Sequence, residues 1–251
     1  MKGAGRWVLP VLHGFVAVAL TALTFVGGLA WLGALAFRRR RWLAFGGLYL
    51  LLSGALWLAA PLAGREGVPC WGEPLRAKGI YCAMNRSFVT PELRALLEDL
   101  AADMDAAHPG TVTVMLDGGF PESGLPLLPH LSHDDGEKAD LAFWYRDAAG
   151  YVPGRTRSPL GYFAFEEGPS HCPRRWPSLR WNMRWLQPLW RDMALDDARM
   201  RFALGWLKRD ARVGKVFVEP HLAARYGVAG GKMRFQGCRS ARHDDHIHLQ
   251  L

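Results

Sequence analysis

Acidic residues are absent from the first 65 positions of this 251-residue chain, which hold seven lysine or arginine side chains. Residues 66–251 carry 24 basic and 23 acidic residues, so nearly all of the formal net charge of +8 belongs to the N-terminal segment. A domain that binds nucleic acid usually carries a strong basic field. Because residues 66–251 have none, we expect no nucleic-acid partner.

Two long stretches of the N-terminal segment contain no charged side chain, Trp7–Phe37 and Trp42–Gly64. Each is longer than the ~20 apolar residues that a helix needs to cross a bilayer, whereas a cleavable signal peptide has a shorter apolar core. We therefore expect two transmembrane helices, about 9–37 and 42–64. The arginines at 38–41 favour a cytoplasmic turn between these helices, which places residues 66–251 outside the cytoplasm.

Cysteine is also missing from the N-terminal segment, and its four occurrences are Cys70, Cys82, Cys172 and Cys238. None of them has the C-x₂-C spacing of a zinc finger. An even number of cysteines in an exported domain favours disulfide bonds, for which three pairings are open. Unpaired cysteines buried in the core are the alternative.

Helical and extended segments follow one another irregularly along residues 66–251, with no internal repeat. Thr90-Pro91 provides an N-cap and an N1 proline, and apolar residues continue at helical spacing to about Ala107. Further segments are expected as strands at 111–116, 141–145, 215–219 and 246–251, as a loop at 120–136, and as helices at 178–194 and 196–209. Because βαβ regularity is missing, we expect an α+β fold with a small antiparallel sheet and flanking helices.

The expected helix 178–194 carries an apolar stripe of Trp181, Trp185, Leu186 and Trp190. A stripe with this spacing usually belongs to the core, so we expect these side chains to be buried. Binding of sugar or peptide by the tryptophans is the alternative.

Five of the nine histidines fall in two short windows, His130-Leu-Ser-His133-Asp-Asp-Gly-Glu-Lys-Ala-Asp140 and His243-Asp-Asp-His246-Ile-His248. In a strand, residues two apart face the same side at a distance of about 6.6 Å, so His246 and His248 project together. One of these histidines is then able to bind a metal ion while the other reaches a water molecule on it.

The upstream window supplies two further candidate ligands, His133 and Asp140, with Gly136 between them to permit a tight turn. Two neutral imidazoles and one carboxylate form a set of three ligands that leaves one coordination position open, as catalytic zinc sites do. No thiolate or methionine belongs to the set, which disfavours redox metals. We expect the other aspartates of the two windows to be solvated turn residues, namely Asp134, Asp135, Asp244 and Asp245.

Together, the two windows resemble the metal-binding motifs of the LAS metallopeptidases, which include lysostaphin-type enzymes, D-Ala-D-Ala peptidases and hedgehog domains. The matching residues are Ser132-His133-x₂-Gly136-x₃-Asp140 and the distal pair His246-x-His248. Penicillin-insensitive murein endopeptidases are the closer match, because a further histidine precedes each of their motifs by three residues. His130 and His243 occupy these positions here, and the resemblance covers roughly residues 110–251.

The resemblance implies a role for each matched residue. His133, Asp140 and His248 would bind Zn²⁺, and His246 would be the catalytic base beside the metal. His243 would be a second catalytic or orienting histidine. The preceding histidine of the upstream window, His130, would bind to a metal ligand and orient it without contacting the metal itself.

Zinc-dependent hydrolysis of the peptide cross-bridges of murein (peptidoglycan) is the activity that this resemblance implies. Peptide stems of murein would be the substrate, the bacterial inner membrane the anchor, and the periplasm the compartment of residues 66–251. Two other readings are open, because a fold does not fix a function. One is a non-catalytic scaffold that binds murein, and the other is a zinc D,D-peptidase with a different substrate.

Overall fold

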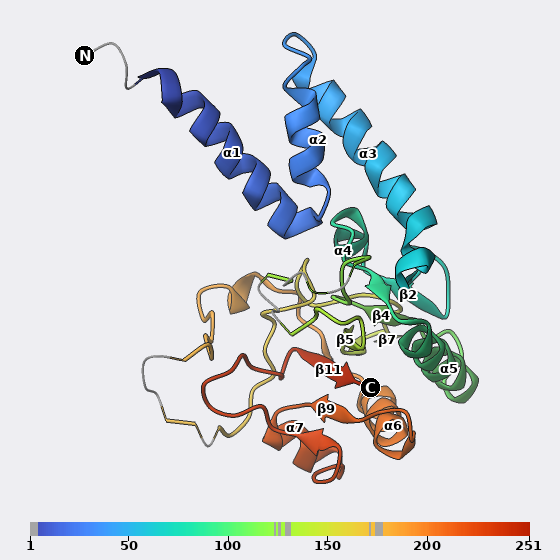
Figure 1. Ribbon diagram of the computed structural model, residues 1–251. Coiled ribbons are helices and arrows are strands. Elements are labelled where there is room, and N and C mark those ends of the chain that lie inside the picture. The colour runs from blue at the N-terminus through green and yellow to red at the C-terminus, as the bar shows by residue number, and fades with distance from the viewer. Residues whose placement is uncertain (1–4, 123, 125–126, 129–131, 171, 174–177) are drawn as a thin grey trace.

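The computed structural model of the protein describes residues 5–122, 124, 127–128, 132–170, 172–173 and 178–251. Its described part has an α+β architecture, as expected, with three apolar helices at the N-terminus and a mixed sheet with flanking helices, which lie below the apolar helices in the view of Figure 1.

The N-terminal segment folds as three helices, α1 (Gly5–Thr24), α2 (Gly27–Ala34) and α3 (Arg41–Ala59), the last continued by the 3-10 helix η1 (Ala60–Ala63). The expectation of one continuous helix over 9–37 was therefore wrong. In the described chain, one helix, Arg41–Ala63, is long and apolar enough to cross a membrane.

A sharp turn at Phe25 (φ +67°) separates α1 from α2. The hydroxyl of Thr24 donates to the carbonyl of Leu20 (2.7 Å) and accepts from the amide of Gly27 (3.1 Å), so it bonds to both helices at the break. Gly28 then allows α2 to approach α1 closely, because a Cβ atom there would lie 2.3 Å from the carbonyl oxygen of Ala17. Local hydrogen bonds and close packing, which hydropathy does not report, end the first helix early.

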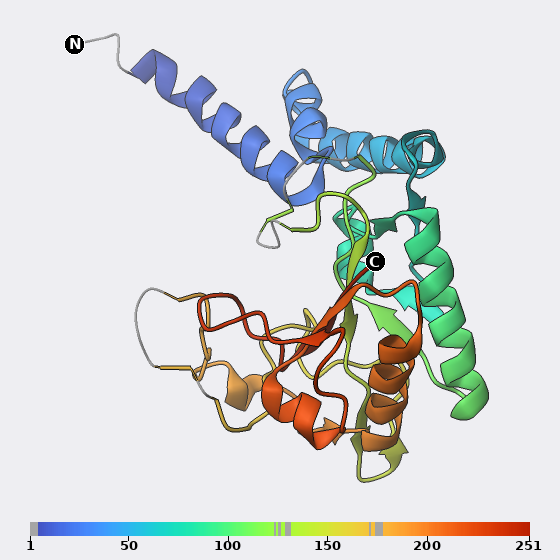
Figure 2. The same cartoon turned by 60° about the horizontal axis from the view of Figure 1, so that its bottom comes forward.

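One face of α3, formed by residues four apart, packs against the rest of the protein. Asn85 Nδ2 donates to the hydroxyls of Tyr49 (3.2 Å) and Ser53 (3.0 Å) and to the carbonyl oxygen at the end of α1 (3.1 Å). One turn further, Trp57 packs on Phe88 with ring centroids 5.1 Å apart. The apolar helices and the α+β domain therefore meet along the side of α3, as Figure 2 also shows.

The main sheet has six strands in the order β10-β9-β11-β5-β4-β2. Their bounds are β2 Leu75–Ala77, β4 Thr113–Met115, β5 Lys138–Ala142, β9 Lys215–Phe217, β10 Met233–Arg234 and β11 His246–Gln250. β11 is antiparallel to both of its neighbours, but the outer pairs β2–β4 and β9–β10 are parallel. The expected antiparallel sheet is corrected to a mixed one, because helical crossovers join each of the parallel pairs.

Two smaller sheets complete the strand inventory of the described residues. One pairs β1 (Glu66–Gly67) with β3 (Phe88–Val89). The other has the order β7-β6-β8, with bounds Gly150–Tyr151, Tyr145–Asp147 and Ala194–Leu195.

Helices α5 (Pro91–Ala107) and α6 (Asp197–Arg209) form as expected and pack beside each other against the same side of the sheet (Figures 1 and 2). The side chain of Thr90 accepts a hydrogen bond from the amide of Leu93 (3.3 Å), and Asp196 caps α6 in the same way (3.1 Å). Two short helices, α4 (Gly79–Ala83) and α7 (Pro220–Arg225), lie outside this pair.

The helix expected at 178–194 does not form, and this prediction was wrong. Only the 3-10 turn η2 (Gln187–Leu189) is helical, and Trp181 and Trp185 are 56% and 71% exposed. Pro188 disrupts a helix at its centre. The backbone amides at both ends of the segment bond to carbonyls of distant loops, so tertiary contacts replace helical ones.

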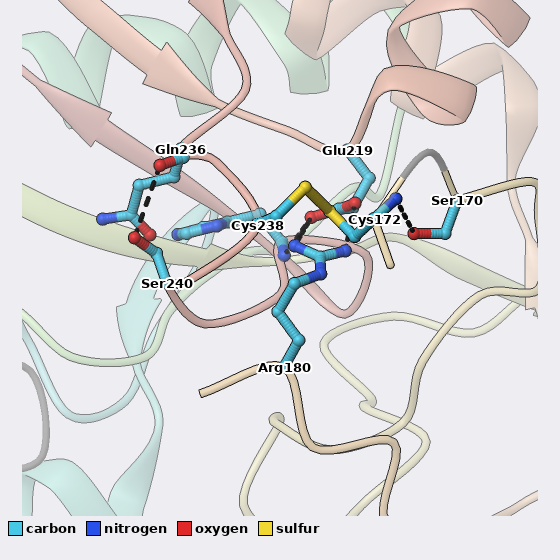
Figure 3. The surroundings of a disulfide bond; sticks show 8 residues. Ser170, Cys172, Arg180, Glu219, Gln236, Cys238 and Ser240 are labelled. Carbon is cyan, nitrogen blue, oxygen red and sulfur yellow. Dashed lines mark hydrogen bonds and ion pairs between the residues drawn. A yellow bond between two sulfur atoms is a disulfide. The ribbon is translucent and has the colours of Figure 1, made fainter. Parts of the chain in front are cut away.

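Two disulfides form, Cys70–Cys82 and Cys172–Cys238, and no free cysteine remains. The first closes a loop near the apolar helices. The second joins segments that are 66 residues apart and sits next to an ion pair between Arg180 and Glu219 (Figure 3).

Candidate metal centre

The pairing of β11 with β5 brings the candidate ligands of the two strands together. His248 lies directly opposite Asp140, and His246 lies opposite Ala142, so both histidines share one face of the sheet with the carboxylate. Ile247 is fully buried in the main core on the opposite face, a burial that contributes roughly 1.5–3 kcal/mol. A slip of one residue would exchange the two faces, so the buried core fixes the side on which the histidines project.

His133 reaches the same point from the loop before β5. The chain turns back at Gly136 (φ +75°), where a Cβ atom would collide with the guanidinium of Arg65. The ring is oriented by a 2.6 Å hydrogen bond between His133 Nδ1 and the carbonyl oxygen of Gly118. Because Nδ1 donates this bond, Nε2 of the neutral ring keeps its lone pair for another partner.

Three candidate ligand atoms converge on one small volume. His248 Nδ1 lies 2.8 Å from Asp140 Oδ1 and 3.2 Å from His133 Nε2, and His133 Nε2 lies 3.5 Å from Asp140 Oδ1. All three residues are buried, and their ligand atoms lie within 4.8 Å of one another. This group could hold a metal ion, as the sequence predicts for the same three residues.

Burial lowers the pKa of His248, and its hydrogen bond to Asp140 opposes the shift. A lowered pKa keeps this imidazole neutral at neutral pH, which is the form that ligates metal. The donor set of two imidazole nitrogens and one carboxylate oxygen fits Zn²⁺ and lacks the thiolates that favour soft metals.

Side chains around the three ligands hold them in orientation. Tyr162 donates its hydroxyl proton to Asp140 Oδ2 at 2.6 Å, and burial raises the pKa of this phenol well above its ordinary value, so it stays protonated. The amide of Gln250 lies 2.9 Å from His248 Nε2. When His248 ligates a metal through Nδ1, its Nε2 carries the proton. The side-chain oxygen of Gln250 accepts the hydrogen bond from this proton once the nitrogen and oxygen of the Gln250 amide are exchanged by a flip.

His246 stands beside the ligand set without being one of its three members. Its Nε2 lies 3.7 Å from Asp140 Oδ1, and its Nδ1 lies 2.5 Å from Asp245 Oδ1. The ring also packs edge-on against Tyr162, with centroids 4.8 Å apart. One ring nitrogen therefore faces the metal position, and the other is held by a carboxylate.

His243 lies next to both histidines of β11. Its ring centroid is 4.9 Å from that of His246 and 5.7 Å from that of His248, and its backbone amide donates to Glu219 Oε1 at 3.2 Å. Glu219 is in turn held by two hydrogen bonds from Arg180 (Figure 3). The structure thus brings four of the sequence-predicted histidines and Asp140 together.

Of the remaining residues named from the sequence, some lie where they were expected and others do not. His130 lies outside the described residues. Asp134 and Asp135 have partly exposed side chains, as expected. Asp244 and Asp245 are both buried, so the expectation that they are solvated turn residues was wrong.

Sequence reasoning missed Asp245 and Tyr162. The position of Asp245 directly before a candidate catalytic histidine was the signal available for it. No local pattern marks Tyr162, because it reaches Asp140 from a loop that folds back over the sheet face.

A cleft of about 1080 Å³ opens beside the segment that leads to His246. The amide of Glu166, on its wall, donates to the carbonyl of Asp244 at 2.7 Å. Arg157 pairs with the Glu166 carboxylate at 2.9 Å, and burial raises the pKa of that acid. Other wall residues include the exposed Trp181 and the half-buried Gln187.

No protein-family model matches the chain, and no curated protein matches it significantly.

Proposed function

We propose that the protein is a zinc-dependent peptidase that hydrolyses peptide cross-bridges of murein. The observation that carries this proposal is the convergence of His133 Nε2, Asp140 Oδ1 and His248 Nδ1, with Nε2 of His246 directed at the same point. A structural zinc site would be closed by a fourth protein ligand, whereas three ligands with a histidine alongside suit catalysis. The resemblance of the motifs to murein endopeptidases supports the choice of substrate.

Each side chain has a defined task in this proposal. Bound by the three ligands, Zn²⁺ would supply Lewis-acid assistance to the attack of water on a peptide carbonyl. His246 takes the proton of the attacking water at Nε2 and returns it to the leaving amine. Tyr162 and the Gly118 carbonyl keep Asp140 and His133 from turning away.

We further propose that the apolar N-terminal helices anchor the enzyme in the bacterial inner membrane, with the α+β domain in the periplasm. The two disulfides support an oxidising compartment. The α+β domain contacts α3 at Tyr49, eight residues after Arg41 and so about 12 Å along the helix axis from its start. A helix that spans the bilayer needs about 30 Å of its length inside the apolar core, so a fully inserted α3 would have Tyr49 within that core. Full insertion of Arg41–Ala63 therefore requires the domain to separate from this part of α3.

Digestion of purified murein by the full chain in detergent tests the activity. We expect soluble muropeptides to be released, the activity to be lost on chelation and to return with added Zn²⁺. The variant His246→Ala should retain zinc but lose nearly all turnover, while His108→Ala, at the C-terminal end of α5, should remain active. A zinc-loaded protein that leaves murein and defined muropeptides intact would overturn the proposal.

Product analysis identifies the bond and separates the proposal from its alternatives. Release of monomeric muropeptides from cross-linked dimers supports an endopeptidase. Removal of a single terminal residue indicates a D,D-peptidase, and binding to murein without any product indicates a scaffold.

A further inference from the structure

Asp245 is a buried carboxylate that bonds to two different groups through its two oxygens. Oδ1 lies 2.5 Å from His246 Nδ1, and Oδ2 accepts a hydrogen bond from the backbone amide of Phe163 at 2.5 Å. Its side chain is 3% exposed. A carboxylate held at both oxygens cannot rotate, so the imidazole bound to it is fixed in orientation as well.

The backbone at Phe163 is itself held from the other side. Phe163 has φ +65°, a left-handed conformation that a residue with a side chain rarely adopts and that persists only where its surroundings enforce it. Its carbonyl oxygen accepts hydrogen bonds from Gln187 Nε2 (2.7 Å) and from Trp190 Nε1 (2.8 Å). The peptide group on the amide side of Phe163 is thereby aimed at Asp245, and Asp245 at His246.

We propose that Asp245 is the positioning residue of His246, an assignment that rests on the proposed function. A carboxylate accepts hydrogen bonds only, so its contact requires the neutral ring of His246 to carry its proton on Nδ1. Nε2, which points at the ligand set, then presents its lone pair to the attacking water. Without Asp245 the ring is free to turn and to place its proton on the nitrogen that must accept one.

The substitution Asp245→Asn tests this assignment with little change in shape. The amide of Phe163 still requires an acceptor, so the oxygen of the new side chain faces Phe163 and its NH₂ group faces His246 Nδ1. The ring must then accept at Nδ1 and carry its proton on Nε2. Because positioning groups around metal sites are worth about 10–100-fold in activity, we expect kcat to fall about 10–100-fold with KM and zinc content little changed.

Asp244→Asn is the matched control. Asp244 is adjacent and equally buried, but its carboxylate is bonded to Arg242 and not to a histidine. We expect this variant to keep its turnover and the proton of His246 on Nδ1. In a His246→Ala background, Asp245→Asn should change the residual rate less than about twofold, because the group through which it acts is gone.

Nitrogen-15 NMR of histidine-labelled, zinc-loaded full chain reports the tautomer without any substrate. The account predicts a proton on Nδ1 of His246 in the wild type and on Nε2 in Asp245→Asn. An unchanged tautomer, or an equal loss of activity from Asp245→Asn with His246 absent, would overturn the assignment of Asp245. Failure of the wild type to cleave murein would instead overturn the proposed function, while the tautomer measurement would still decide the role of Asp245.

Discussion

Replacing Asp244 by asparagine should remove a specific dependence of stability on pH. Burial raises the pKa of Asp244 from its ordinary value of 3.8 to about 6, and the ion pair with Arg242 only partly opposes the increase. The folded protein therefore holds a proton on this acid at pH values where the unfolded chain has already lost it. Each pKa unit corresponds to about 1.36 kcal/mol, so the raised pKa contributes about 3 kcal/mol of stability at low pH, of which about 2.5 kcal/mol is lost as the pH rises from about 4 to about 7.

Urea unfolding of the full chain and of Asp244→Asn, measured across this pH range, isolates the effect. Asparagine cannot ionise, so the difference in unfolding free energy between variant and wild type should move in favour of the variant by about 2.5 kcal/mol between about pH 4 and pH 7. Equal m-values would show that the same states are compared. A difference that does not vary with pH would refute the raised pKa of Asp244 and the claim that burial outweighs the ion pair with Arg242.

Three further predictions concern the centre, the disulfide and the apolar helices. Tyr162→Phe removes the hydrogen bond to the carboxylate ligand and should weaken zinc binding about 10–100-fold in a competition assay with a chromogenic chelator, and unchanged affinity would contradict this role. Replacing both Cys172 and Cys238 by serine opens a loop of 66 residues and should lower the free energy of unfolding by about 4 kcal/mol. A loss of less than about 1 kcal/mol would contradict this prediction. Cysteines at Ser53 and Asn85 should be joined by a short thiol crosslinker in detergent but not in native membranes, and efficient joining in membranes would refute full insertion of α3.

Features set by local chemistry were predictable from the sequence. The start of α5 was predictable because the hydroxyl of Thr90 caps the helix and the ring of Pro91 fits its first turn, and both effects involve only neighbouring residues. The candidate metal centre was predictable for a different reason, since few residue types bind zinc, alternation along a strand places two histidines on one face, and the resemblance of the motifs to a known family chose between them. His248 and Asp140 are accordingly partners across two adjacent strands.

Features set by contacts between distant segments were not predictable. The tryptophan stripe around Trp181 has helical spacing, but Pro188 and bonds to distant loops hold the segment in an irregular path. Asp245 resembles a turn residue in the sequence, and only the return of Phe163 over the sheet face shows that it is buried. The break at Phe25 likewise depends on how closely α2 packs against α1, which hydropathy does not record.

Zinc content and muropeptide cleavage of the full chain, wild type against His248→Ala, test the central claim most directly. The account predicts about one zinc ion per wild-type chain, and in the variant the loss of both bound zinc and cleavage, because three ligands cannot be reduced to two without losing the site. His108→Ala should retain both properties. A His248→Ala variant that binds zinc and cleaves muropeptides as the wild type does would contradict the account.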